Sequence, residues 1–321
     1  MADWLGEALE AARDPFALIV KGPRVLAEWM DQRREKRYQE FIDAARVGDV
    51  FPENAEAMTA EDLVAIMRSL EQDMEAEKSV LYGRLARTIA LGRIVLSERR
   101  HFIKVLRELS FHQVEQLRSA HVSTLFNLYP GSGSGRMVPK DFLASLVEHD
   151  KLQIEQFGLW AKDSLSPTGK RLVEACYLKD ELTPQAIGAR EWVDGMLDII
   201  CNEIGEGECS RFIDEVTMVG HGRLVKVRNQ AAFRSNNTIS SLFPASMAVL
   251  LYFDPSKLTS QWKFVEERIR PGTEVVTASF DDGSSREPTL SSYRHFNLAS
   301  GIPIVASEII DHFLAAKSGE R

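Results

Sequence analysis

Three aspartates follow two apolar runs in the C-terminal third of the sequence. Asp254 comes directly after MAVLLYF, and Asp281 and Asp282 follow VVTASF. Unbroken apolar runs of this kind are typical of strands buried on both faces of a parallel sheet. If the two strands are parallel neighbours, their carboxyl ends meet at the edge where α/β proteins bind ligands. We therefore assign the three aspartates to a ligand-binding crevice.

Clustered carboxylates at such an edge could hold a divalent cation through their oxygen atoms. Asp-Pro-Ser and Asp-Asp-Gly, however, are also ordinary turn and helix-capping sequences. We predict that this crevice binds its ligand without a metal ion and without a cofactor.

Histidine and cysteine offer little nucleophilic chemistry. His221 lies between two glycines in VGHGRL and is kept as a further ligand-binding candidate, although a turn residue explains it more simply. No GxSxG elbow accompanies it or His295, so a serine hydrolase is not indicated. Cys176, Cys201 and Cys209 are odd in number and lack CxxC spacing, which argues against disulfides and against a structural zinc site.

The stretch LYPGSGSGRMVP, residues 128–139, has the glycine content of a phosphate-binding loop. Such a loop joins a buried strand to a helix N-terminus, where backbone N–H groups face the phosphate. Here the preceding LFNLY is typical of a helix end, and no Lys-Ser or Lys-Thr follows the glycines. We predict a flexible connector, and a stretch this regular could also be an artificial replacement of a longer loop.

Helical periodicity dominates the first 110 residues, which we expect to form a helical bundle. Helices are predicted at residues 23–47, from an N-cap at Thr59 with Asp62 three residues on, at 74–95 and at 98–109. The basic run QRREKR, residues 32–37, lies among acids of the same helix and is expected to be a solvated face. Contact with phosphates or with an acidic membrane surface is the alternative.

The middle of the chain predicts a winged-helix-like module. Its order is a helix opened by a Ser110–Gln113 capping box, a helix in MVPKDFLASLVEHD, a hairpin-like stretch at FGLW, and a helix capped by Ser166 or Thr168. The second helix should turn four apolar residues inward: Phe142, Leu143, Leu146 and Val147. Residues 111–180 carry eight basic and eight acidic side chains, a balance that argues against DNA binding.

The character of the sequence changes toward its C-terminal end. Thr183 followed by Pro184 predicts a helix that reaches Ile204. Helical patterns at 257–269 and 306–316 then alternate with four segments that read as strands. These segments are GRLVKVRN, MAVLLYFDP, TEVVTASFDDG and IPIVA. The alternation predicts an α/β domain with a largely parallel sheet.

Composition limits the class of protein. The 321 residues carry a formal net charge of −8, and no segment has the positive field of a general nucleic-acid binder. The longest apolar run near the N-terminus, FALIV at residues 16–20, is too short for a signal-peptide core or a membrane span. We expect a soluble cytoplasmic chain that binds a protein partner or a small ligand, and homo-oligomerisation stays open.

Three helical segments carry a family resemblance: AEWMDQRREKRYQEFIDAA, the pair EKSVLYGRLARTIA and RRHFIKVLRELSFHQVEQL, and LSPTGKRLVEAC. Their order over residues 20–178 resembles the abortive-infection alpha family of bacterial proteins. That family is helical, has a module ending in an LT-x-x-G helix, and is associated with phage defence; SPTGK departs slightly from its usual form. The resemblance implies a defence-associated, non-enzymatic helical portion and transfers no catalytic residue.

We thus expect an α-rich chain of three domains: a helical bundle (1–110), a winged-helix-like module (111–180) and an α/β domain (181–321). The expected function is that of a non-enzymatic binding or sensor protein in bacterial anti-phage defence. Two alternatives stay open. One is a metal-dependent phosphoester-processing enzyme that uses Asp254, Asp281 and Asp282, and the other is a ligand-responsive DNA-binding regulator.

Overall fold

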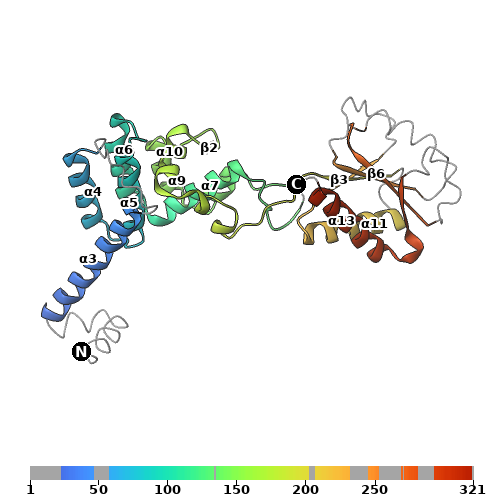
Figure 1. Ribbon diagram of the computed structural model, residues 1–321, viewed down its shortest axis with the longest axis horizontal. Helices are drawn as coiled ribbons and strands as arrows, with labels where there is room; N and C mark the ends of the chain where they lie inside the picture. Colours follow the sequence, from blue (N-terminus) through green and yellow to red (C-terminus); the bar gives the residue numbers. More distant parts are fainter. Residues whose placement is uncertain are drawn as a thin grey trace. The chain divides into compact units, whose positions relative to one another are not determined.

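The chain forms two compact units in the computed structural model, one mainly helical and one built on a sheet (Figure 1). The helical unit comprises Met1–Phe126 and Val138–Ile187, and the α/β unit comprises Asn127–Met137 and Gly188–Arg321. The structure describes residues 23–46, 58–133, 135–201, 207–231, 245–252, 269, 271–280 and 293–319. A mostly helical N-terminal part and a C-terminal five-stranded parallel sheet confirm the predicted division of helix and strand.

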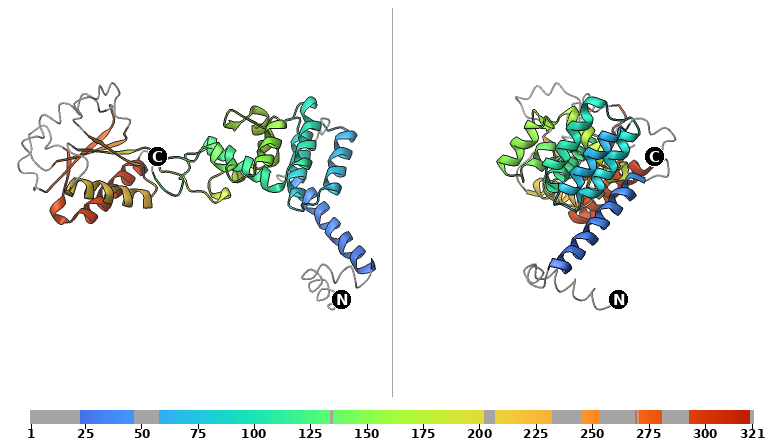
Figure 2. Two further views of the ribbon diagram at one scale, coloured as in Figure 1. Left: turned by 180° about the vertical axis from the view of Figure 1, so that it is seen from behind. Right: turned by 90° about the vertical axis from the view of Figure 1, so that its left-hand side faces the viewer.

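The described helices of the helical unit follow one another with short connections. They are α3 (Pro23–Arg46), α4 (Ala60–Gln72), α5 (Lys78–Ala90), α6 (Leu96–Glu108), α7 (Phe111–Leu125), α8 (Pro139–Leu143), α9 (Glu148–Gln156) and α10 (Pro167–Cys176). A hairpin of β1 (Trp160–Ala161) and β2 (Ser164–Leu165) precedes α10, and the 3-10 turns η2 (Lys179–Glu181) and η3 (Gln185–Ile187) follow it. The N-terminal end of α3 extends beyond the other helices of this unit (Figure 2).

Side-chain caps start several of these helices where the sequence predicted them. The Thr59 hydroxyl accepts a hydrogen bond from the backbone N–H of Asp62 at 3.1 Å, and the Asp62 carboxylate accepts one from the Thr59 N–H. Ser110 and Gln113 form the same reciprocal capping box at α7, and Ser166 caps α10. Each cap satisfies backbone donors that an α-helix leaves unpaired at its start. The predicted caps at Thr59 and Ser110 are confirmed, and of the two candidates for α10, Ser166 and Thr168, the structure has Ser166 as the cap.

A glycine sets the packing of α3 on α5. A Cβ atom at Gly83 would lie 2.3 Å from the backbone oxygen of Phe41, so only glycine permits this approach. Around it the two helices bury Phe41, Ala44, Leu81, Tyr82 and Leu85.

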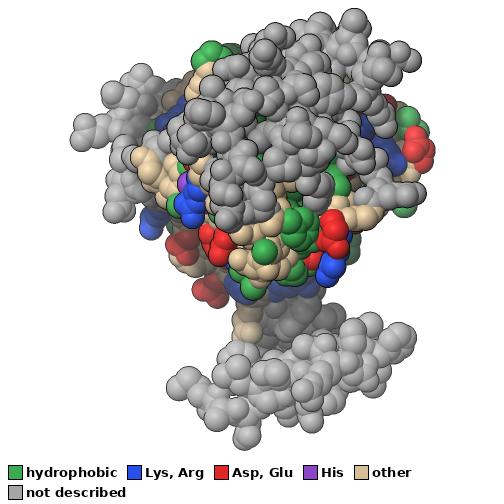
Figure 3. Space-filling model, turned by 90° about the vertical axis from the view of Figure 1, so that its right-hand side faces the viewer, with side chains coloured by type: hydrophobic (Ala, Val, Ile, Leu, Met, Phe, Trp, Pro, Cys, Tyr) green, Lys and Arg blue, Asp and Glu red, His purple; other side chains and the backbone are tan. Residues whose placement is uncertain are grey.

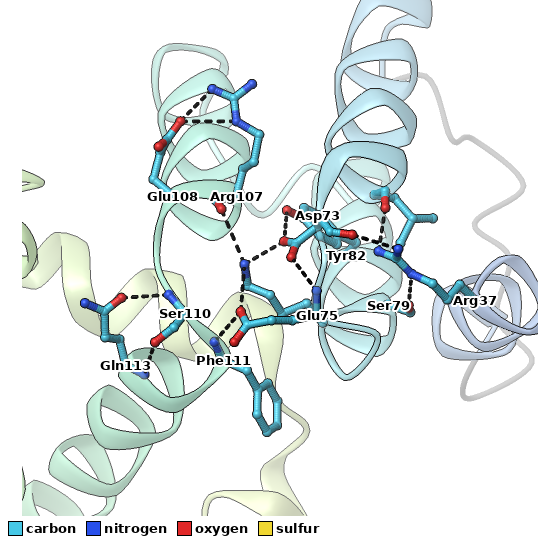
Figure 4. A network of polar contacts seen from close by, with 12 residues as sticks. Arg37, Asp73, Glu75, Ser79, Tyr82, Arg107, Glu108, Ser110, Phe111 and Gln113 are labelled. Carbon is cyan, nitrogen blue, oxygen red and sulfur yellow. Dashed lines mark hydrogen bonds and ion pairs between the residues drawn. The ribbon is translucent and has the colours of Figure 1, made fainter. Parts of the chain in front are cut away.

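A network of polar contacts joins α3, the α4–α5 turn and α6 (Figure 4). The buried Lys78 ammonium lies 2.6 Å from a carboxylate oxygen of Asp73, which also accepts a hydrogen bond from the Tyr82 hydroxyl at 2.9 Å. Arg37 donates to the backbone oxygens of Leu70 and Asp73 at the end of α4. Part of the basic run QRREKR therefore serves the packing of helices: Arg37 caps a neighbouring helix, whereas Lys36 pairs with Glu40 on the surface.

The α/β unit is built on a sheet with the strand order β4-β3-β5-β6-β7, in which every neighbouring pair is parallel. Its strands are β3 (Leu197–Cys201), β4 (Val227–Ala231), β5 (Met247–Leu251), β6 (Glu274–Ser279) and β7 (Arg294–Asn297). Taken in chain order the arrangement is 2-1-3-4-5, one of the two common doubly wound orders. The five residues of β5 are all buried, in agreement with the apolar run that predicted this strand.

Two helices, α11 (Gly207–Gly222) and α13 (Ile302–Gly319), pack side by side on one face of the sheet (Figures 1 and 2). They form one core with the strand residues Leu197, Ile199, Val249 and Val276. The opposite face carries a second apolar cluster that includes Ile200, Leu250 and Tyr252. Strands with apolar residues on both faces explain why the sequence runs are unbroken rather than alternating.

Three sequence-based expectations are wrong. The helix predicted from Thr183 to Ile204 is absent from its described part, residues 183–201, where a single 3-10 turn at Gln185–Ile187 is followed by Gly188 at φ +68° and the buried strand β3. The segment IPIVA is the start of α13 rather than a strand, and Pro303 suits the first turn of a helix. The predicted helix in MVPKDFLASLVEHD is divided into α8 and α9, and Val147 is 64% exposed between them.

Candidate functional site

The predicted aspartate crevice meets its geometric condition in the backbone. Strands β5 and β6 are adjacent and parallel, with Leu251 paired to Ala278, so their carboxyl ends lie at the same edge of the sheet. Asp254, Asp281 and Asp282 themselves lie outside the described residues. The assignment of these three side chains to a ligand site therefore stays a prediction.

His221 lies at the opposite edge of the sheet. It occupies the C-terminal end of α11, and the turn after it leads into β4 beside the start of β3, where Val193 N–H donates to Leu224 O. Its ring centroid is 5.3 Å from that of Trp192, in an edge-on arrangement. Burial lowers the pKa of His221, and its Nε2 atom is buried without a hydrogen-bond partner among the described residues. The structure thus places His221 at the other end of the sheet from the carboxyl ends of β5 and β6, which the three aspartates follow in sequence.

The glycine stretch contacts the aromatic residues that surround His221. The Tyr129 and Trp192 rings meet edge to face with centroids 4.7 Å apart, and Trp192 Nε1 donates to Gly135 O at 2.8 Å. Lys226 Nζ donates to Asn127 Oδ1 at 2.8 Å. The stretch connects α7 to α8 and does not join a buried strand to a long helix, the arrangement that a phosphate-binding loop requires. It is a connector anchored at both of its ends.

A pocket of about 780 Å³ lies in the helical unit, between α5, α7 and α10 and beside η2. Its volume is within the ordinary range for small-molecule sites. Its cationic lining residues are Arg84, Arg87, Arg93, Arg171 and Lys179. Apolar side chains also line it, among them Leu91, Ile94, Leu125, Phe126 and Leu182. A lining of both kinds suits a ligand that has charged groups and an apolar body.

Among the described residues, carboxylates neutralise two of these cations. Arg84 forms a bidentate ion pair with Glu181, and Arg171 forms a bidentate ion pair with Glu98. Arg87, Arg93 and Lys179 have no ion pair within the described part of the chain, whereas Glu174 is the single carboxylate of the lining. Three unpaired cations against one carboxylate leave an excess of two positive charges in the pocket. This surplus occurs in a chain whose net charge is −8.

Two buried nitrogen atoms of the pocket lining have no hydrogen-bond partner in the described structure. They are Nε of Arg84 and Nδ1 of His121, a histidine that is only 3% exposed. Burial lowers the pKa of His121 against the opposing effect of Glu174, whose carboxylate lies 3.6 Å from Nε2. The ring is therefore mainly neutral at pH 7. Unpaired buried polar atoms are costly, and they commonly mark a site that a ligand or an ordered water satisfies.

The sequence reasoning missed this pocket. Its polar residues come from α5, the turn after it, α7, α10 and η2, so no local spacing joins them. The available signal was the segment YGRLARTIALGR, residues 82–93, which has three arginines and no acid. A stretch so basic is unusual in an acidic chain, and it is the sequence feature that points to this pocket.

Among the described residues, no group of three or more His, Cys, Asp or Glu side chains is placed to hold a metal ion. No helix within that same part of the chain is long and apolar enough to cross a membrane. On the face drawn in Figure 3, the described acidic and basic side chains are interspersed with apolar ones. No protein-family model matches the sequence, and no curated protein and no solved structure matches it.

Proposed function

We propose that this chain is a non-enzymatic binding protein of the sensor type, whose helical unit captures a small anionic ligand. The observation that carries the proposal is the excess of positive charge in a pocket of the helical unit, supplied by Arg87, Arg93 and Lys179. Local positive potential in a low-dielectric concavity attracts anions more strongly than the same charges on an open surface. The setting proposed for this sensor is bacterial anti-phage defence, which rests on the resemblance of the helices to the abortive-infection alpha family.

Binding can be tested directly with the full chain. Calorimetric titration with ATP, inorganic triphosphate, citrate and octanoate should reveal binding of at least one anion, with no turnover of the bound molecule. The double variant Arg87→Gln/Arg93→Gln should weaken that binding by about tenfold or more, since each unpaired cation contributes a charge-assisted contact.

A matched control removes the same amount of charge elsewhere in the helical unit. Arg68 and Lys104 line a shallow groove between α4 and α6, are exposed, and have no ion pair within the described residues. Arg68→Gln/Lys104→Gln should leave anion binding unchanged. Equal loss in both double variants, or no binding of any of the four anions, would contradict the proposed function.

For the order α7, α8, α9, hairpin and α10 we retain the winged-helix-like description as a proposal. In such modules the helix before the hairpin enters the DNA groove. That helix would be α9, which carries Glu148, Asp150 and Glu155 against Lys151. Its acidic surface favours a scaffold or protein-contact role over the DNA-binding regulator, because phosphate contacts require cations.

The metal-dependent phosphoesterase is retained as a second candidate because β5 and β6 are parallel neighbours. This adjacency is what an aspartate cluster after both strands would need. The two candidates concern different units of the chain. Measurements on pocket variants and on aspartate variants can therefore distinguish them.

A further inference from the structure

The pocket of the helical unit has three kinds of lining, and one class of ligand matches all of them. The first is the set of cations that have no ion pair among the described residues, Arg87, Arg93 and Lys179, which leaves an excess of two positive charges after Glu174 is counted. A ligand with a single carboxylate neutralises only half of that excess. Phosphoryl groups of a di- or triphosphate carry enough charge, and arginine binds their oxygens in a two-pronged geometry.

The second lining is apolar. Leu91, Ile94, Leu125 and Phe126 contribute side chains to the same pocket, and Leu125 is 57% exposed although it is a large hydrophobic residue. Inorganic phosphate or triphosphate would leave this surface in contact with water. A ligand with an organic body would cover it, and the burial of apolar surface favours binding.

The third lining separates two kinds of organic body. Nε of Arg84 and Nδ1 of His121 are buried nitrogen atoms without partners in the described structure, and both residues line the pocket. A hydrocarbon chain has no atom that could pair with them. A nucleobase or a sugar has both acceptors and donors, so its polar edge would satisfy these nitrogens while its flat face packs on the apolar side chains.

We infer that the pocket binds a nucleotide, a multiply charged organic phosphate whose phosphates contact Arg87, Arg93 and Lys179 and whose base or sugar pairs with Arg84 and His121. This inference rests on the proposed anion-binding function and adds the class of ligand. The volume of about 780 Å³ accommodates a molecule of that size. Arg84 is fixed in position for this role by its ion pair with Glu181 and by its contact with Cys176 O.

The experiment compares complete and partial ligands on the full-length chain. Calorimetry would measure the affinities of the four common ribonucleoside triphosphates, inorganic triphosphate, adenosine and dodecyl phosphate. We expect at least one ribonucleoside triphosphate to bind about tenfold tighter, or more, than each of the other three probes, because only it engages all three linings. Dodecyl phosphate that binds as tightly would overturn the inference in favour of a lipid-like ligand and would leave the proposed function intact. If inorganic triphosphate binds as tightly, charge alone explains the binding: the inference of a nucleotide is overturned and the proposed anion-binding function stays intact.

Two variants assign the contacts. His121→Phe keeps an aromatic ring at this position but has no ring nitrogen atoms, so it should weaken nucleotide binding about fivefold to tenfold and leave the affinity for inorganic triphosphate unchanged. Leu125→Ser changes an exposed side chain and should have the same selective effect, which keeps the test informative if the buried substitution unfolds the chain. Unchanged nucleotide affinity in the folded variants would overturn the inference. If none of the anionic probes binds the unmodified chain, the proposed function itself fails.

Discussion

The ammonium group of Lys78 lies 2.6 Å from the carboxylate of Asp73, and the two side chains are only 2% and 4% exposed. Asp73 accepts further hydrogen bonds from the Tyr82 hydroxyl and from the backbone N–H of Glu75. The Glu75 carboxylate in turn lies 3.4 Å from Lys78 and accepts a hydrogen bond from Phe111 N–H (Figure 4). Burial of charge is costly unless every partner is present, so this group of residues should behave as a unit.

Single substitutions in this network should be severe, and the double substitution should cost less than their sum. We expect Lys78→Met or Asp73→Ala to lower the free energy of unfolding by about 3 to 5 kcal/mol, because each leaves a buried charge without its partner. In Lys78→Met/Asp73→Ala neither charge remains. Urea unfolding of the full chain measures these values. Lys36→Met, which breaks an exposed pair with Glu40 at 3.7 Å, is the control and should cost less than about 0.5 kcal/mol. Additive losses in the double variant would contradict the account.

The sequence allowed the caps and the long helices to be predicted, because these depend on neighbours within a few residues. Ser110 with Gln113 is an example of such a cap, and the buried apolar run of β5 allowed a strand to be predicted in the same way. The errors arose where local patterns are ambiguous. IPIVA is five apolar residues, too few to show that Val305, Ile309 and Phe313 continue a helical face, and Thr183-Pro184 starts only a single turn before Gly188.

The candidate site was less predictable than the fold. Arg87, His121 and Lys179 meet through tertiary packing, and no local spacing could bring them together. The glycines beside His221 indicate a candidate from local sequence, whereas Trp192 and Tyr129, which are remote in the sequence, form its environment. Sequence order could indicate that β5 and β6 are strands, but only the pairing of the strands makes them neighbours.

The glycine stretch should be sensitive at two of its three glycines. Gly131 and Gly133 have φ angles of +87° and +71°, which residues with a side chain adopt at a cost of about 1 kcal/mol each. Gly135 is not in that region, and a Cβ atom there meets nothing within 4 Å. We therefore expect Gly131→Ala and Gly133→Ala each to lower stability by about that amount, and Gly135→Ala, the matched control, to have little effect. Thermal unfolding followed by circular dichroism would decide. Equal and negligible shifts in all three variants would indicate a connector without backbone constraint.

Alanine at Gly83 should destabilise the helix in which it lies. In an ordinary helix interior, Gly→Ala stabilises by up to about 1 kcal/mol. At Gly83 the added Cβ would lie 2.3 Å from Phe41 O and 2.8 Å from the Ala44 Cβ, so α3 and α5 must separate. Gly222 in α11 is the control, since a Cβ there meets nothing within 4 Å. We expect urea unfolding to show a loss for Gly83→Ala and none for Gly222→Ala. A gain in stability for Gly83→Ala would show that α3 does not pack on α5 as described.

Divalent cations should have little effect on the α/β unit. Asp254, Asp281 and Asp282 follow parallel neighbouring strands, and a bound Mg²⁺ would stabilise the folded chain by about 2.7 kcal/mol at a hundredfold excess over its dissociation constant. If the aspartates act as caps and turn residues, millimolar Mg²⁺ or Mn²⁺ leaves the melting temperature unchanged, and Asp254→Asn costs about 1 kcal/mol or less. We predict this second outcome. A metal-dependent rise that disappears in Asp254→Asn or Asp281→Asn would make the phosphoesterase the leading function.

Acid should destabilise the chain in part through His121. Burial lowers the pKa of this histidine in the folded chain, against the effect of Glu174 and with a smaller contribution from Lys170. The unfolded chain, with a histidine pKa near 6.5, then binds a proton that the folded chain does not, so stability falls as the pH drops below about 6.5. The slope from one such group is at most about 1.4 kcal/mol per pH unit.

Urea unfolding at pH 8, 7, 6 and 5 should show a shallower loss of stability toward acid pH for His121→Gln than for the unmodified chain, whatever the variant costs at pH 8. His221, whose pKa burial also lowers, acts in the same direction, so the double variant His121→Gln/His221→Gln should be shallower still. A steeper acid loss in His121→Gln would mean that the Glu174 carboxylate prevails and that the folded chain holds His121 protonated.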